Sequence, residues 1–163
     1  MYSIKREYLD KYMPKVVGGY YTNFKPYHLD NFNEESIFGV SGVDLDICKA
    51  HIIQQSISGP FITAMVNGEP VAVFGAVIFW SGVAEAGALF TEQARRYPLA
   101  MTKGAYVFFD ICEILFTLHR LQITVRSNDQ RAVKWAKRLG FVEEGILKQY
   151  SADQQDYYMM RRS

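Results

Sequence analysis

The sequence has little of several features that mark particular protein classes. Among its 163 residues only two are cysteine and five are proline, and the formal net charge is +1. No apolar run reaches the roughly 18 residues that a membrane span needs, and residues 1–7 lack the apolar stretch of a signal peptide. The near-neutral charge gives no general reason to bind nucleic acid or an anionic membrane. We therefore expect a cytoplasmic protein that binds neither.

Cysteine and histidine are scarce and scattered. The two cysteines, Cys48 and Cys112, lie far apart and match no metal-binding or redox spacing, which predicts two reduced, buried thiols. The three histidines, His28, His51 and His119, form no ligand pattern, and we interpret each as a surface or packing residue. The sequence therefore predicts neither a disulfide framework nor a metal centre.

Aromatic and aliphatic side chains, by contrast, are abundant. Tyrosine and phenylalanine number 11 each, aromatics make up 15% of the chain, and 49% of the residues are hydrophobic. A chain of 163 residues is long enough to bury a substantial core as one domain. We expect residues 1–18 to be an amino-terminal extension and residues 19–163 to form a single domain with a ring-rich core or interface.

The first half of the chain predicts short helices and strands. Residues 4–13 have helical composition and end before Pro14, which cannot easily continue a helix. Two turn pairs, Asn67-Gly68 and Ser81-Gly82, separate apolar runs and predict a meander of three antiparallel strands. The strands expected here are 20–25, 61–66, 71–80 and 83–90, and the further helices are 27–32 and 44–55.

The second half predicts two longer helices between strands. A helix is expected over 102–118, a strand over 121–126, and a helix over 130–139 that Gly140 closes. Two last strands are expected near 146–150 and 157–161. Without the amino-terminal extension, the order is β-α-α-β-β-β-α-β-α-β-β. It predicts a mixed α/β fold in which helices flank a central, mostly antiparallel sheet.

Sequence motifs in the last third carry a family resemblance. Leu-His-Arg at 118–120 precedes the strand at 121–125, and Asn128 and Ala132 follow it. A helix then ends in Leu-Gly-Phe-x-Glu-Glu-Gly at 139–145. The chain from about residue 20 to residue 161 resembles the GNAT acyltransferases, which move an acyl group from coenzyme A to an amine. Short GNAT-like proteins of tailed bacteriophages, including small virion proteins, are the members that it resembles most.

The resemblance implies a phosphate-binding loop before the long central helix, at 92–101. Family members have glycines there, whose backbone N–H groups converge on the coenzyme pyrophosphate. This chain has Arg-Tyr-Pro-Leu-Ala-Met at 96–101, so it lacks those glycines, and Gly104 lies too far along the helix to replace them. Arg95 and Arg96 are the candidate phosphate ligands. The alternative is that they form a solvated helix start, with Pro98 in the first turn.

The resemblance also places the thioester beside the strand at 83–90. In the family this strand bulges and splays from the next one, which leaves an N–H for the carbonyl oxygen. Gly87 is the expected kink, and Leu89, Phe90 and Thr91 are expected to flank the thioester. The alternative is an ordinary strand.

Three further positions concern proton transfer and the pantetheine arm. Glu85, in an otherwise small and apolar strand, is the candidate general base, unless it points to solvent. Relatives that use a tyrosine to protonate the thiolate have it where this chain has Ala136, so that acid is absent here. Tyr106 and Tyr150 are candidates to replace it; the alternative is that each is a core residue. Asn128 is expected to contact the pantetheine arm; alternatively, it or the preceding serine caps the next helix.

Two functions remain open at the level of sequence. The first is an N-acyltransferase that passes the acetyl group of acetyl-CoA to a small-molecule or protein amine by direct attack. The alternative is an inactive GNAT-fold protein that binds a protein partner, such as a phage accessory or virion protein. The aromatic-rich carboxyl end, around Tyr150 and 157–160, predicts either a homodimer edge or core packing.

Overall fold

A seven-stranded sheet organises the protein in a computed structural model that describes residues 2–16, 18–33 and 45–162. The strand order is β1-β2-β3-β4-β5-β7-β6. Only the β4–β5 pair is parallel among the six described pairings. The strands are β1 (Gly19–Asn23), β2 (Phe61–Val66), β3 (Glu69–Trp80), β4 (Val83–Phe90), β5 (Arg120–Arg126), β6 (Phe141–Leu147) and β7 (Tyr157–Arg162).

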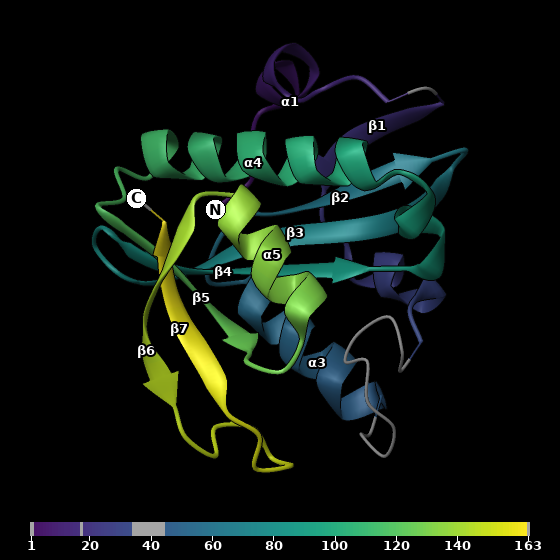
Figure 1. Cartoon of the computed structure of the whole chain (residues 1–163). Coiled ribbons are helices and arrows are strands. Elements are labelled where there is room, and N and C mark those ends of the chain that lie inside the picture. The colour runs from purple at the N-terminus through teal and green to yellow at the C-terminus, as the bar shows by residue number, and fades with distance from the viewer. Residues whose placement is uncertain (1, 17, 34–44, 163) are drawn as a thin grey trace.

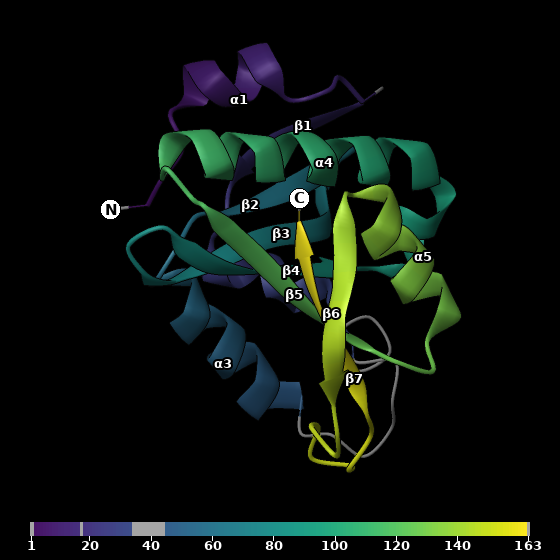
Figure 2. The ribbon, with the colours of Figure 1, turned by 60° about the vertical axis from the view of Figure 1, so that its left-hand side comes forward.

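Helices cover both faces of this sheet (Figures 1 and 2). The α-helices are α1 (Arg6–Tyr12), α3 (Leu45–Ser56), α4 (Pro98–Leu115) and α5 (Gln130–Arg138), and two 3-10 helices are η1 (Pro26–Asn31) and η2 (Glu92–Arg96). One face carries α1, α4 and α5 over the main core, whose largest buried side chains include Phe74, Phe108, Phe109 and Phe141. The other carries η1 and α3 over a smaller core around Leu29, Phe32 and Ile52. The mixed α/β architecture is confirmed.

Local sequence signals located the meander and the last helix correctly. The strands expected at 61–66 and 83–90 have those bounds. Asn67 and Gly68 both adopt positive φ, at 52° and 80°, as a two-residue hairpin turn requires. Gly140 has φ 95° after α5 and ends the helix as predicted. These signals are local, so no tertiary contact was needed to interpret them.

Several elements differ from the prediction in their bounds or type. The strand expected at 146–150 is β6, Phe141–Leu147, because the Glu-Glu-Gly segment pairs with β7 instead of turning. The long helix α4 begins at Pro98 and ends at Leu115, before Thr117 adopts φ 50°. The helix expected at 27–32 is the 3-10 helix η1. The helix expected at 44–55 is α3, and residue 44 lies outside the described residues.

The amino-terminal segment packs into the main core. Ile4, Leu9 and Met13 are buried there. The Asn23 side chain donates to the carbonyl of Ile4 and accepts from its N–H, both at 2.9 Å. These contacts fix α1 beside β1 and make the segment part of the packed fold.

The aromatic-rich carboxyl segment lies inside the sheet. β7 pairs with β5 on one side and with β6 on the other, and Met160 is fully buried. β7 is therefore an interior strand of the sheet, whereas Tyr150 is exposed, and the open edge at that end of the sheet is β6. Arg162 anchors β7 to the helical layer, because its Nε donates to the carbonyl of Leu139 and its Nη1 to Glu113.

A close approach between β1 and α4 depends on a glycine. Gly104 of α4 lies against the hydroxyl of Tyr21. The Tyr21 residue is 4% exposed, and its hydroxyl has no hydrogen-bond partner among the described residues. Burial raises the pKa of Tyr21 to about 12. A Cβ at residue 104 would overlap that hydroxyl. Gly104 is thus required by packing, in agreement with its predicted place within a helix.

This contact gives a double-mutant prediction. We expect Gly104→Ala to destabilise the protein by about 2 kcal/mol, because the added methyl group overpacks the interface. Tyr21→Phe alone should change stability by less than about 0.5 kcal/mol, since the lost hydroxyl is unpaired. In the double variant we expect about half of the loss to be recovered, as measured by urea unfolding. Strictly additive effects would contradict this interpretation.

Within the described part of the chain, no helix is long and apolar enough to cross a membrane.

Candidate functional site

β4 and β5 separate after a short stretch of pairing. They pair at three positions only, the last of which joins Glu85 to Gln122. Beyond it β4 continues to Phe90 and β5 to Arg126 without further pairing between them. The sheet therefore opens as a V between these two strands, with Glu85 at its apex.

The opening arises without a bulge in β4. Gly87 pairs with Gly75 of β3 in regular register, so the kink expected at Gly87 is absent. The irregularity in this pair lies in β3 instead, between Ile78 and Trp80. The strands separate because their directions diverge, in keeping with the twist between neighbouring strands.

A cleft of ≈160 Å³ lies on the α3 side of the sheet next to this opening. Its walls come from α3, β2, β3 and β4 and are mostly apolar, with Ile52, Phe61 and Leu89 among them. Glu85 is the carboxylate in this lining. Gly87 keeps space free there, since no atom lies within 4 Å of where its Cβ would stand. The cleft can accept a small group and present one negative charge to it.

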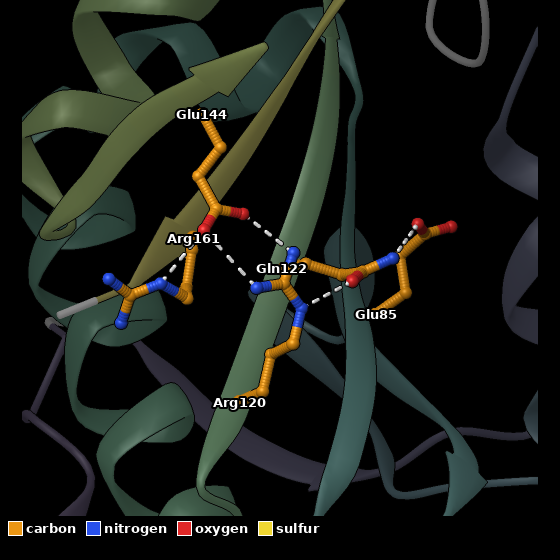
Figure 3. Close-up of polar contacts among 5 residues, drawn as sticks. All are labelled: Glu85, Arg120, Gln122, Glu144 and Arg161. Carbon is orange, nitrogen blue, oxygen red and sulfur yellow. Dashed lines mark hydrogen bonds and ion pairs between the residues drawn. The ribbon is translucent and has the colours of Figure 1, made fainter.

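Glu85 belongs to a chain of polar contacts that crosses four strands (Figure 3). Gln122 Nε2 donates to Glu85 Oε1 at 3.1 Å, and Gln122 Oε1 accepts from Arg120 Nε at 2.8 Å. Arg120 in turn binds Glu144 through Nη2 at 2.6 Å, and Arg161 Nε donates to the same carboxylate at 3.1 Å. Glu85 is thus held in a network and does not simply point to solvent.

Glu144 reaches this network from a β-bulge. The pairing of β6 with β7 shifts between Glu143 and Gly145, which leaves Glu144 as the extra residue. The hydrogen bond from Arg120 holds the pKa of Glu144 below its ordinary value, and Arg161 adds to this effect. The sequence alone does not predict this network of Arg120, Gln122, Glu144 and Arg161, because only the strand order brings β5, β6 and β7 together.

The side chains of the three residues expected to flank the thioester lie in three different surroundings. Leu89 lines the cleft on the α3 side. Phe90 packs in the opposite layer against Phe74, at 5.9 Å between ring centroids. Thr91 is buried, and both its N–H and its Oγ1 donate to the carbonyl of Val71, at 2.9 Å each. Their side chains therefore form cleft wall, core and anchor respectively.

Trp135 of α5 bridges to α4 and to the end of β4. Its Nε1 donates to Thr102 Oγ1 at 3.0 Å, and its ring lies edge-on to Phe90 at 5.1 Å. Ala136 beside it is buried and supplies no acid. The Trp135 indole N–H is thus engaged with Thr102, and an indole is in any case too weak an acid to protonate a thiolate.

The two tyrosines considered as replacement acids lie in other contacts. Tyr106 on α4 is covered by the guanidinium of Arg162, at 4.6 Å from its ring centroid. Tyr150 lies in the connection between β6 and β7 and packs against Tyr157. Neither contact involves β4 or the cleft.

The start of α4 is open to solvent. Arg95 and Arg96 are exposed at the end of η2, and among the described residues neither has an ion-pair partner. Pro98 occupies the first helical position and has no N–H to offer. Leu99 is 84% exposed, so it does not fill the space in front of the helix. Two arginines and the next two N–H groups of the helix remain available to an anion.

Asn128 is exposed in the turn after β5 and does not cap α5. The cap is Asp129, whose Oδ1 accepts from the N–H of Ala132 at 3.1 Å. The capping alternative for Asn128 or Ser127 was therefore wrong by one or two residues, since Asp is as good a cap as either.

The chain folds like solved acetyltransferases. Ard1 from Thermoplasma volcanium superposes with a TM-score of 0.75 and 19% identity over 89% of this chain and 97% of that one. RimL, a ribosomal L7/L12 alpha-N-protein acetyltransferase in complex with coenzyme A, superposes with a TM-score of 0.74 and 15% identity, over 92% of this chain and 96% of that one. The ribosomal-protein-S5-alanine acetyltransferase from Vibrio fischeri superposes with a TM-score of 0.71 and 12% identity, over 91% of this chain and 94% of that one.

The chain has the GNAT fold. No protein-family model matches the sequence, and no curated protein matches it either. The GNAT likeness thus lies in the path of the backbone, and at these identities it establishes the fold alone.

The GNAT-based site prediction thus divides into two regions. Glu85 and Leu89 lie together at the cleft on the α3 side. Arg95 and Arg96 lie at the entrance to α4, and Asn128 lies in the turn before α5. The structure gives no contact between the two regions among these residues, so their joint use depends on a ligand that spans both.

Proposed function

We propose that this protein is an N-acyltransferase that transfers the acetyl group of acetyl-CoA to an amine. The observation that carries this proposal is the separation of β4 from β5 immediately after Glu85, beside a cleft that this carboxylate faces. Where two neighbouring strands separate, a thioester can reach backbone groups that no strand pairs with. A carboxylate at that point can take a proton from the amine.

The reaction needs few groups from the protein. An ammonium acceptor gives one proton to Glu85, and its freed nitrogen lone pair attacks the thioester carbonyl carbon. The new C–N bond forms, the C–S bond breaks, and the second amine proton leaves with the sulfur as the thiol. Because neither the indole of Trp135 nor the methyl group of Ala136 is an acid, this route takes no proton from these two residues of α5.

The positive charge at the start of α4 is suited to a phosphate group. The helix start offers fewer backbone N–H groups than a glycine loop would supply. Arg95 and Arg96 would pair with phosphate oxygens. The N–H groups of Leu99 and Ala100, together with the helix dipole, would add to this. We therefore expect binding that depends on side-chain charge more than on a backbone nest.

Calorimetry with acetyl-CoA tests this proposal. We expect micromolar affinity for the wild type, and an affinity at least about tenfold lower after Arg95→Gln with Arg96→Gln, because two charge-assisted contacts are lost. Pantetheine serves as the ligand control, since it lacks the phosphates. Lys11→Gln with Lys15→Gln, which removes two exposed cations from the amino-terminal segment, serves as the matched variant. Equal weakening by both pairs would contradict a phosphate site at Arg95 and Arg96.

Peptide amino termini are the acceptors to test first. Two of the similar structures are ribosomal-protein acetyltransferases, and a cleft of ≈160 Å³ is large enough for the first residue of a chain but not for a large drug. Small amines are the second class.

A second function is favoured by a different observation. Trp135, Phe90 and Thr102 join α5, β4 and α4 by direct contacts, and the start of α4 has no glycine nest. Such a scaffold suits a protein that has given up the coenzyme and binds a protein partner instead. Absence of acetyl-CoA binding at millimolar ligand would favour this function over the first.

A further inference from the structure

We propose that Gln122, oriented by Arg120, is a positioning residue that fixes the Glu85 carboxylate for proton transfer from the acceptor amine. This inference rests on the proposed function. It gives a role to two residues of β5 that the sequence alone did not predict to act at the site.

The hydrogen-bond chemistry fixes which way the Gln122 amide points. Arg120 is a donor only, and its Nε lies 2.8 Å from Gln122 Oε1, so the amide oxygen must face the guanidinium. The amide nitrogen is thereby turned toward Glu85, whose Oε1 it meets at 3.1 Å. A carboxylate oxygen accepts hydrogen bonds, so this orientation gives Glu85 Oε1 a donor and fixes the direction of the carboxylate.

Arg120 is itself held on the other side. Glu144 accepts from its Nη2 at 2.6 Å and from its Nη1 at 3.3 Å, an arrangement that fixes the plane of the guanidinium. The bulge in β6 supplies Glu144, and Arg161 of β7 gives the same carboxylate a second cation. Each side chain from Glu144 to Glu85 is thus oriented by the one before it (Figure 3).

A contribution to folding stability alone does not account for this series of hydrogen-bonded side chains. The Arg120 and Glu144 side chains are 29% and 34% exposed, and pairs with that much solvent contact contribute little to folding. What the series of contacts does provide is one fixed orientation of the Glu85 carboxylate. Among the residues that the structure describes, Gln122 is the one hydrogen-bond donor to Glu85, and it leaves Oε2 unengaged beside the cleft. An acceptor amine would meet that second oxygen.

The test compares the pH dependence of kcat/KM in the wild type, Gln122→Leu, Gln122→Glu and the control Thr124→Val, which lies two residues further along the same face of β5. In Gln122→Leu we expect kcat to fall about tenfold, since a hydrogen bond to a charged group is lost, with KM for acetyl-CoA unchanged.

The acid limb of the pH profile should move to higher pH in this variant because the carboxylate loses its donor. Gln122→Glu should move it further, since like charges disfavour ionisation. Thr124→Val should match the wild type. An unmoved acid limb in both Gln122 variants would overturn the inference.

A substrate-free measurement separates this inference from the proposed function. The side-chain amide of Gln122, followed by NMR with labelled glutamine, should shift during acid titration, and that shift should vanish in Glu85→Gln. An amide that does not respond to acid overturns the inference whatever the activity. If the amide responds but the wild type neither binds acetyl-CoA nor transfers acetyl groups, the proposed function fails, and the positioning role fails with it.

Discussion

Glu85→Gln is expected to lower kcat/KM by about 100- to 10,000-fold, the usual contribution of a general base. The glutamine side chain has the same size and can still contact Gln122, so the fold and the cleft should be retained. What it cannot do is accept a proton from the ammonium group of the acceptor. Steady-state kinetics with a peptide amine measure the effect, and calorimetry should give unchanged acetyl-CoA affinity.

The matched control is Glu69→Gln, the same chemical change at an exposed carboxylate at the start of β3. It should retain wild-type kinetics and stability. A Glu85→Gln variant that keeps full activity would show that the acceptor loses its proton elsewhere. A variant that also loses acetyl-CoA binding would show that the change disturbs the site itself.

Gly59→Ala is expected to destabilise the protein by about 3 kcal/mol, near the upper end for a single substitution. Residue 59 lies just before β2, where the carbonyls of Ser58 and Pro60 accept from the N–H groups of Ile78 and Ala76. A Cβ at this position would overlap the carbonyl oxygen of Ala76, which is backbone and cannot turn aside. The added methyl group must therefore push the chain away from β3 and break those hydrogen bonds.

Thermal unfolding measures this loss, and a fall in Tm of roughly 10 °C is expected for a domain of this size. Gly87→Ala is the control, because no atom lies within 4 Å of a Cβ there and the added residue has better strand propensity. It should leave Tm unchanged or raise it slightly. Similar losses from both substitutions would mean that glycine flexibility, and not the Ala76 contact, governs stability.

Prediction from sequence succeeded where the signal was short-range. The turn pair Asn67-Gly68 and the helix stop at Gly140 depend on positive φ, which few residues tolerate. Prediction failed at β6, because the charged segment around Glu144 has no strand pattern of its own. Every residue from Val142 to Ile146 is exposed, and only pairing with β7 and the ion pairs across the face make it a strand.

The candidate site also combines a residue that local sequence could identify with one that only the fold reveals. Glu85 could be singled out because a lone carboxylate interrupts a run of small apolar residues. Its partner could not, since Gln122 is 37 positions away and meets it only through the parallel register of β4 and β5. The kink expected at Gly87 failed for a related reason: the direction of two strands is set by the whole sheet, and not by one glycine.

Residue types and their spacing were sufficient to define the mixed sheet, its meander, the absence of glycines before α4 and the carboxylate in β4. These features depend on backbone preference and alternation, which are encoded within a few residues. Tertiary structure alone determined that β4 and β5 part at Glu85, that Trp135 reaches Thr102, and that a bulge in β6 ends a polar chain leading to the cleft. These contacts join residues dozens of positions apart, and their geometry follows from strand order and twist, which no local pattern specifies.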